Sequence, residues 1–357
     1  MLIIDAHLDL AWNAMQGNRN LQQSVYTIRT QESDLSGAGR GQGTVAFPEM
    51  RQGRVALCFA TLIARSTGHP VPNLDYSSPL QAYAAAQGQM AYYEALGESG
   101  EVRLIKDLKE LNSHIMQWEQ WESDTQKSQP PIGLIISMES ADPILKPKQL
   151  LAWKEAGLRV IGPAHYGPGR YAGGTSTELG LTADGVTLLN EMERLNIILD
   201  LTHLSDEAFW DALDVFGGTV IASHNNCRTL VPHQRQFDDR QIHTIIDRDG
   251  VIGAAFDNWM IRPGWVRGAK DNEHVVIEHI VDHIDHICQL AGNAKHSAIG
   301  SDLDGGFGRE QSPSDLDTIA DLQKLVDILI RRGYSMNDIS LIMHGNWLRL
   351  LRNAWVS

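Results

Sequence analysis

The first side chains suited to metal chemistry are His7 and Asp9, in the stretch IIDAHLDLAW near the start of the chain. Side chains of an extended segment alternate between its two sides, so residues two apart project the same way. Imidazole and carboxylate groups are ligands of Zn²⁺ and similar divalent ions, so this pair could hold one ion. On its own the pair is a weak signal, because a single histidine at a strand end is more often a hydrogen-bonded structural residue.

Further histidines and carboxylates each follow a later apolar run. They are Glu139 in ISMES, His165 in GPAHY, His203 in DLTHLS, His224 in ASHNN, and Asp302 and Asp304 in IGSDLDGG. Each has a plainer explanation: Glu139 could cap a helix or pair with a cation, and Asp302 and Asp304 ahead of two glycines could form a turn. All of them falling at the ends of successive runs by chance is improbable. Together they predict a metal site.

The residue types favour a site for two divalent ions, most simply Zn²⁺. The candidate ligands are His7, Asp9, Glu139, His203 and His224. The first two would hold one ion, the last two would hold the other, and the glutamate could bridge them. A metal pair lowers the pKa of bound water to about 7, so a bridging hydroxide would be a nucleophile at neutral pH. Asp302 could accept its proton and pass it to a leaving amine, as general base and then general acid.

Other residues have weaker functional interpretations. His279, His283 and His286 share one face of a predicted helix. A metal could bind there, but a solvated or intersubunit helix face is the favoured interpretation. Trp259, in FDNWMIRPGW, is predicted near the rim of a pocket.

Eight short apolar runs must position these side chains. They span residues 2–4, 54–63, 132–137, 158–163, 197–201, 219–222, 251–256 and 297–299. They are almost continuously apolar, which is typical of parallel strands covered on both faces. Helical patterns lie between them at 79–97, 103–122, 147–156, 182–195, 205–216, 238–249 and 272–292, with Thr182 and Ser205 as N-caps. Strands alternating with helices predict an α/β fold, a (β/α)₈ TIM-type barrel whose active site lies at the carboxyl ends of the strands.

The alternative fold is an open doubly wound sheet, but no GxGxxG motif follows an early strand. The segment 17–53, rich in Gly, Gln and Arg, is predicted as a long loop, and 123–131 as a surface linker. The tail 314–355 predicts two or three additional C-terminal helices. We expect residues 1–357 to form one domain.

Composition excludes several classes of partner. The net charge of −14 argues against nucleic acid and against anionic membranes. No apolar stretch reaches the ~18 residues of a membrane span, and no signal peptide is apparent. Three widely spaced cysteines, Cys58, Cys227 and Cys288, indicate reduced thiols in a cytoplasmic protein.

Over nearly its whole length the sequence resembles the membrane (renal) dipeptidase family of metallopeptidases, peptidase family M19, within the amidohydrolase-like barrels. The resemblance rests on DAHLDLAW, SMESAD, DLTHLSDEAFW, IASHNN, RQFDDRQI and IGSDLDGGFG. It implies a (β/α)₈ barrel with a binuclear zinc centre that hydrolyses dipeptides. It also implies that His165 contacts the tetrahedral intermediate, that Arg235 binds the substrate's C-terminal carboxylate, and that Asp302 shuttles the proton. Arg235 could instead pair with Asp238 or Asp239 at the surface.

The sequence departs from the family at MESAD, where a glycine usually follows the bridging glutamate, and it lacks the leader and anchoring signal of secreted members. The substrate therefore stays open: dipeptides with a D-residue at the C-terminal position, or another amide, an N-acyl amino acid or a lactone. Barrel deaminases usually have HxH in place of the His7–Asp9 motif, and no lysine ends the fourth strand, as a carbamylated-lysine site would need. A metal-storage or scaffold protein would not need Asp302. The C-terminal helices could support a homodimer.

Overall fold

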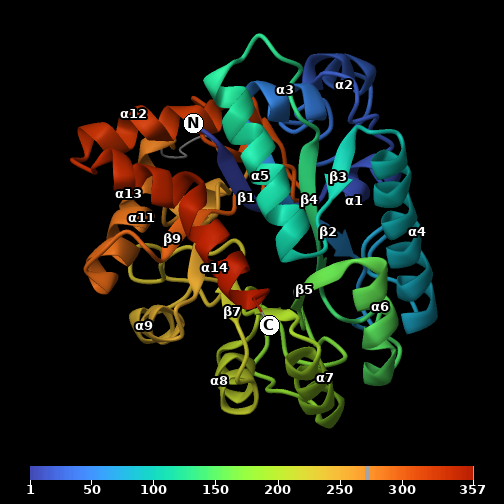
Figure 1. Cartoon of the computed structure of the whole chain (residues 1–357). Coiled ribbons are helices and arrows are strands. Elements are labelled where there is room, and N and C mark those ends of the chain that lie inside the picture. Colours follow the sequence, from blue (N-terminus) through green and yellow to red (C-terminus); the bar gives the residue numbers. More distant parts are fainter. Residues whose placement is uncertain (270–273, 357) are drawn as a thin grey trace.

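A computed structural model of the chain describes residues 1–269 and 274–356. The strands within these residues are β1 (Ile3–Leu8), β2 (Val55–Ile63), β3 (Val102–Leu104), β4 (Ile132–Glu139), β5 (Leu158–Gly162), β6 (Ile198–Asp200), β7 (Val220–Ala222), β8 (Val251–Ala254) and β9 (Ser297–Ile299). They form one sheet in the order β2-β1-β9-β8-β7-β6-β5-β4-β3, and an additional pairing of β2 with β4 closes it. Eight strands therefore make a closed parallel barrel, which confirms the predicted fold class (Figure 1).

Helices surround the barrel (Figure 1). They are α1 (Leu10–Met15), α2 (Val25–Gln31), α3 (Phe47–Gln52), α4 (Pro79–Glu98), α5 (Leu108–Ser123), α6 (Leu150–Ala156), α7 (Ala183–Arg194), α8 (Asp206–Val215), α9 (Asp239–Asp247), α10 (Asn258–Ile261), α11 (Glu278–Ala291), α12 (Lys324–Arg331), α13 (Met336–Ser340) and α14 (Asn346–Ala354). Thr182 and Ser205 cap α7 and α8 as predicted, each accepting a hydrogen bond from a backbone N–H of the first turn. No helix of the described residues is long and apolar enough to cross a membrane.

Three predicted boundaries differ from the structure. The segment 17–53 is not one long loop, because it contains α2, capped by Ser24, and α3, which has a proline in its first turn. The helix predicted at 103–122 begins only at Leu108, since the preceding residues form β3, an edge strand outside the ring that pairs with β4. The helix predicted at 272–292 begins at Glu278, and residues 272–273 lie outside the described residues.

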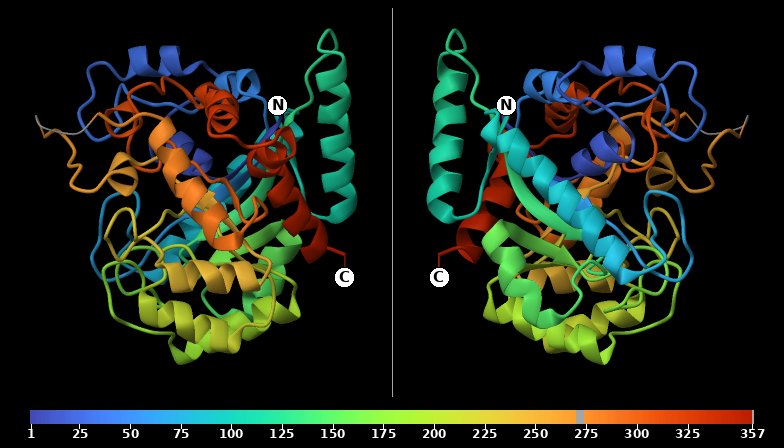
Figure 2. Two further views of the ribbon diagram at one scale, coloured as in Figure 1. Left: turned by 90° about the vertical axis from the view of Figure 1, so that its left-hand side faces the viewer. Right: turned by 90° about the vertical axis from the view of Figure 1, so that its right-hand side faces the viewer.

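The C-terminal helix α14 closes the amino-terminal end of the barrel. Trp347 is fully buried in a cluster with Ile4, Phe59 and Ile135 from the barrel strands, and its ring lies 5.4 Å from that of Phe59. Asn346 donates hydrogen bonds to the carbonyls of Ala294 and Ser297, just before and at the start of β9. Helices α14 and α5 lie side by side on this side of the molecule in both views of Figure 2. At the opposite end of the barrel, where the strands finish, the loops that follow the strands surround the opening.

Candidate metal centre

Every sequence-predicted site residue is found at the carboxyl end of the barrel. His7 lies in β1, Glu139 ends β4, and His165, His203, His224 and Asp302 follow β5, β6, β7 and β9 within three residues. His203 and Asp302 have left-handed backbone conformations, with φ of 68° and 57°. Such conformations are uncommon for residues other than glycine and tend to occur at functional sites. At His203 and Asp302 the backbone turns away from the barrel axis, while both side chains point into the pocket at the carboxyl end of the barrel.

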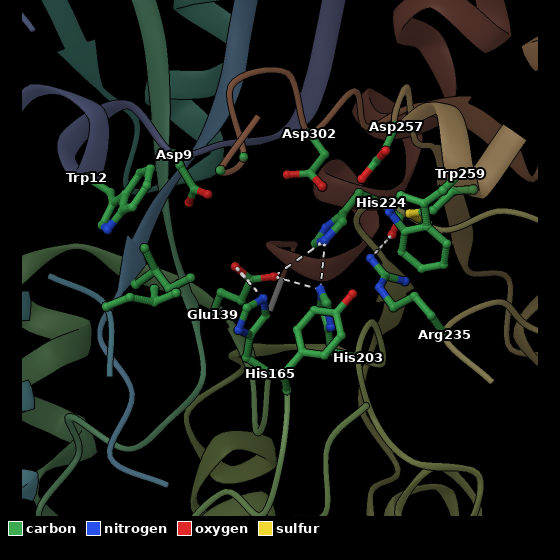
Figure 3. A pocket seen from close by; sticks show the side chains of 16 residues that line it. Asp9, Trp12, Glu139, His165, His203, His224, Arg235, Asp257, Trp259 and Asp302 are labelled. Atoms are coloured by element: carbon green, nitrogen blue, oxygen red, sulfur yellow. Dashed lines mark hydrogen bonds and ion pairs between the residues drawn. The ribbon is translucent and has the colours of Figure 1, made fainter. Parts of the chain in front are cut away.

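One group of ligand atoms is compact. The Nε2 atoms of His203 and His224 lie 3.2 Å apart, and both lie close to Oε1 of Glu139, at 3.3 and 3.4 Å (Figure 3). Two ligands on a tetrahedral zinc ion with Zn–N bonds of 2.0–2.1 Å would be about 3.3–3.4 Å apart. The spacing of these three atoms therefore fits a shared cation.

The second group uses the other oxygen of the same glutamate. His7 Nε2 lies 3.7 Å from Glu139 Oε2, 3.8 Å from Asp9 Oδ1 and 3.8 Å from Asp302 Oδ1. His7, Asp9 and Glu139 form one set of potential ligands whose atoms lie within 4.8 Å of one another, and His7, His224 and Asp302 form another. The two oxygens of Glu139 thus face two different sets of donors.

The histidines of both groups are oriented from behind by hydroxyl groups. Nδ1 of His203 lies 3.0 Å from the hydroxyl of Thr175, and Nδ1 of His224 lies 2.9 Å from the hydroxyl of Ser223. His7 Nδ1 is 3.5 Å from the hydroxyl of Thr61. A hydroxyl oxygen can accept a hydrogen bond from Nδ1–H, which leaves the lone pair of Nε2 free to bind a metal.

Three buried atoms at the centre have no hydrogen-bond partner within the described chain: His7 Nε2, Asp9 Oδ1 and Glu139 Oε1. Buried polar atoms are nearly always paired, so unpaired atoms in both groups of potential ligands are the arrangement expected where cations bind. A mixed imidazole and carboxylate set suits Zn²⁺ and related divalent ions. The residues present therefore fit a metal centre.

Burial shifts the acids and the imidazoles in opposite directions. It raises the pKa of Asp9 to about 7, and together with repulsion between the carboxylates it raises the pKa values of Glu139 and Asp302 well above their usual range. Burial lowers the pKa of His7 to about 3 and that of His203 well below its usual value. Neutral imidazoles are the form that binds metal, and a cation would relieve the repulsion between the acids.

The centre opens into a pocket of about 560 Å³, including its solvent-filled mouth. Its lining includes Trp12, Tyr166, Trp259, Met260 and Asp257 (Figure 3). Trp259 lies at the pocket, as the sequence predicted.

Arg235 lines the same pocket and is 2% exposed. Its guanidinium donates to Asn225 Oδ1 at 2.6 Å. It also donates to the His224 carbonyl at 2.9 Å, and Figure 3 shows Arg235 and His224 at the pocket. The alternative pairing with Asp238 or Asp239 is not what the structure shows, since Asp238 caps α9 and Asp239 binds His286 and Thr229.

Two interpretations from the sequence were wrong. His283 does not lie on a solvated face: it is 1% exposed, and its ring bonds to the backbone of Cys227 and Ile261. Asp304 does not face the pocket, because it accepts hydrogen bonds from Thr44, Val45 and Arg19.

Two other residues near the site were missed. Asp257 lines the pocket after β8, and Arg65 lies behind His165. Asp257 also stands at a strand end, so the rule that found the other site residues could have found it. Arg65 contacts a residue 100 positions away, and no local pattern indicates it.

The closed parallel barrel and its cluster of histidines and carboxylates define the chain as a metallohydrolase of the barrel type. A family model described as "Membrane dipeptidase (Peptidase family M19)" matches residues 1–356. The chain therefore belongs to this family of metallopeptidases, as the sequence motifs predicted.

Relatives and solved structures agree with this assignment. An uncharacterised Klebsiella pneumoniae protein from the pqqA 5′ region is 33% identical over 216 residues, which cover 58% of this chain and 76% of that protein. Dipeptidase tcpJ of Claviceps purpurea is 32% identical over 205 residues, 56% of this chain but only 45% of the fungal protein. The fold matches that of dipeptidase AC, an M19 metallopeptidase, with a TM-score of 0.81, 23% identity, and coverage of 100% of this chain and 99% of that one. It also matches a Rhodobacter sphaeroides metallopeptidase bound to a phosphinate mimic of L-Ala-D-Ala, with a TM-score of 0.80, 22% identity and 99% of both chains covered.

Proposed function

We propose that the protein is a zinc-dependent dipeptidase whose substrates include dipeptides with a D-residue at the C-terminal position. The observation that carries the proposal is the convergence, at one pocket, of two sets of metal ligands with the buried Arg235 and the half-buried carboxyl group of Asp302. The D-residue is supported by the L-Ala-D-Ala mimic bound to the Rhodobacter sphaeroides protein of the same fold. Dipeptides carry the terminal carboxylate that an arginine recognises.

His7 and Asp9 would hold one zinc ion, His203 and His224 the other, and Glu139 both. When bound, the pair supplies a Lewis acid for the scissile carbonyl and a hydroxide nucleophile at neutral pH. The remaining steps belong to the side chains around the centre.

Arg235 would bind the free carboxylate of the dipeptide. Its guanidinium is already fixed by Asn225 and by the His224 carbonyl, so little side-chain freedom is lost on binding. A planar guanidinium pairs with a carboxylate through two parallel hydrogen bonds. Because Arg235 is anchored to the backbone of His224, it would set the peptide bond at a constant place relative to the centre.

Asp302 would move the proton. Its carboxyl group lies 3.8 Å from His7 Nε2, at the edge of the centre that faces the pocket. It would accept the proton of the attacking hydroxide and deliver it to the leaving nitrogen. His165, on the opposite side of Glu139, would donate a hydrogen bond to the carbonyl oxygen as negative charge develops there.

An amide of another class is the alternative substrate. An N-acyl amino acid also offers a carboxylate to Arg235, whereas a lactone does not. Location in the cytoplasm, a homodimer and a single-domain chain stay predictions.

The test is hydrolysis of a stereochemically diverse dipeptide library by protein loaded with zinc, with N-acyl amino acids and lactones assayed in parallel. We expect dipeptides to be cleaved fastest, and elemental analysis to give about two zinc ions per chain. Cleavage of the N-acyl amino acids or lactones alone would favour the alternative. No hydrolysis of any dipeptide by protein carrying two ions would reject the proposal.

A further inference from the structure

Arg65 lies directly behind His165, on the side away from the metal centre. It follows the end of β2 by two residues and is 8% exposed. Its Nη1 lies 2.9 Å from Nδ1 of His165, while Nε2 of the same ring lies 3.9 Å from Glu139. His165 lines the pocket and Arg65 is not part of that lining. Arg65 reaches the pocket through the two residues that it contacts, by the short contact to the His165 imidazole and by a longer one, 3.5 Å, to the Tyr166 carbonyl.

The hydrogen-bonding chemistry of this contact has one solution. A guanidinium carries five N–H donors and no acceptor, and it stays protonated in proteins. Nδ1 of His165 must then be the acceptor. In a neutral imidazole the single proton consequently sits on the other nitrogen, Nε2, which faces Glu139 and the pocket.

The other histidines of the centre have the opposite arrangement. Thr175, Ser223 and Thr61 place hydroxyl groups behind His203, His224 and His7. A hydroxyl oxygen can accept a hydrogen bond from Nδ1–H, so these rings can keep a lone pair on Nε2. A guanidinium cannot accept, so the ring of His165 presents an N–H at Nε2. The group behind each ring thus separates metal ligands from a hydrogen-bond donor.

Arg65 is itself held in place. Its Nε lies 3.3 Å from Asp75 Oδ2, and Asp75 also accepts hydrogen bonds from the backbone N–H and the hydroxyl of Thr67. The backbone of Arg65 bonds to Leu74 and Tyr76, which closes the loop 65–76 on itself. The arginine is therefore held in a fixed position behind the pocket lining. Asp75, which pairs with its charge, keeps its hydrogen bonds to Thr67 when the arginine is replaced.

We propose that Arg65 is a positioning residue that fixes His165 in the tautomer with its proton on Nε2, and so makes His165 a donor to the carbonyl oxygen of the substrate. A ring in this form has no lone pair at Nε2, so it is neither a metal ligand nor a general base at that atom. The identity of the acceptor rests on the proposed dipeptidase function. The tautomer does not, because it follows from the contact between Arg65 and the ring.

The first test reads the tautomer directly. Zinc-loaded protein is labelled with ¹⁵N-histidine, and the signals of His165 are assigned by their absence from a His165→Gln variant. We expect the Nε2 signal to be of the protonated type and the Nδ1 signal of the unprotonated type. A proton on Nδ1 would overturn the proposal. This measurement needs no substrate, so it stands even if the protein cleaves no dipeptide, which would reject the proposed function alone.

The second test is a double-mutant cycle of Arg65→Met and His165→Gln on the most rapidly cleaved dipeptide. Arg65→Met should lower kcat at least about tenfold, up to the ~10²–10³-fold known for loss of one oxyanion donor, and should change KM less. In the His165→Gln background the same change should have no further effect. Arg170→Met, on the loop that carries His165 but bonded to Leu145 instead, is the matched control and should keep the wild-type kcat.

Equal losses from Arg65→Met in both backgrounds, or a loss no larger than that of Arg170→Met, would show that Arg65 does not act through His165. Partial recovery of kcat in Arg65→Lys would support the proposal, since an ammonium group can also donate to Nδ1.

Discussion

At the scale of single residues, Asp302 is half-buried and lies at the edge of the centre. Its carboxyl group lies 3.8 Å from His7 and lines the pocket. We predict that Asp302→Asn, which keeps the shape but cannot exchange the proton, lowers kcat by about 10²–10⁴-fold while two zinc ions remain bound. The measurements are steady-state kinetics and elemental analysis.

The control for this change is Asp34→Asn, an exposed carboxylate in the loop after α2, which should behave as wild type. A near-normal kcat in Asp302→Asn would remove its role as proton carrier. Loss of one zinc ion would instead make Asp302 a ligand, a role open to it through the set that it forms with His7 and His224.

Arg235 is expected to act on the ground state and the transition state alike, because the substrate carboxylate takes no part in bond breaking. We predict that Arg235→Met raises KM and lowers kcat/KM by about 10–100-fold, the size of a lost charge-assisted hydrogen-bond pair. For a dipeptide amide, which lacks the carboxylate, wild type and variant should be similar. If Arg235→Met lowered kcat/KM equally for the free dipeptide and for its amide, Arg235 would not bind the substrate carboxylate.

The sequence predicted these side chains to different degrees. His7, Glu139, His203, His224 and Asp302 could be found because a parallel barrel brings all strand ends together, so a local rule identifies a distant cluster. Arg235 follows no strand end and came only with the family resemblance. Arg65 was not found, because its importance lies in a contact formed only when two loops 100 residues apart come together.

At the scale of elements, the segment between α1 and α2 is tied to the loop that carries Asp302. Arg19, 7% exposed, donates to both oxygens of Glu32 at 2.9 and 3.0 Å, and also bonds to Asp304 at 3.3 Å. Asp304 lies two residues beyond Asp302, so this contact fixes the loop after β9. The geometry of Asp302 thus depends on a segment that lies far from it in the sequence.

We predict that Arg19→Met lowers the free energy of unfolding by about 3–5 kcal/mol, since it leaves the buried carboxylate of Asp304 without its cation and leaves Glu32 with Arg40 alone. Urea unfolding at pH 7 measures this change, and kcat should fall as well because the Asp302 loop loosens. Arg331→Met, an exposed arginine paired with Glu278, is the control and should change stability by less than about 1 kcal/mol. Equal effects of the two changes would show that the buried contact does not hold the loop.

The same segment shows why element prediction was incomplete. The glycines and glutamines of 17–53 suggested a loop, yet Ser24 and a proline in the first turn of α3 mark two helix starts that the composition obscured. Strand β3 was missed because it has three residues, two of them half-buried, and runs into a helical pattern. Long apolar runs that are buried on both faces were predictable from the sequence. Short elements such as β3, which form only by pairing with a neighbouring strand, were not.

At the scale of the whole molecule, the two ends of the barrel have different tasks. The amino end of the barrel is closed by Trp347 of α14, which packs on Phe59 inside the barrel. Among the described residues, the groups of potential metal ligands all lie at the other, carboxyl end of the barrel. The tail 314–355 was predicted as helices, but its place across the strands was not, because nothing in a helix sequence states which surface it covers. The carboxyl end, free of this packing, can hold buried charge.

That buried charge predicts that the metal stabilises the whole fold. His7 Nε2, Asp9 Oδ1 and Glu139 Oε1 have no hydrogen-bond partner in the described chain, and the crowded carboxyl groups repel one another. A ligand that binds only the folded state at 100 times its Kd adds about 2.7 kcal/mol. We therefore expect chelation to lower Tm by several degrees, and added Zn²⁺ to restore it. Zinc-saturated chelator is the control and should leave Tm unchanged. His203→Ala removes one potential ligand, so it should reduce the difference in Tm between chelated and zinc-loaded protein. If the wild-type protein had the same Tm with and without zinc, these residues would hold no tightly bound ion.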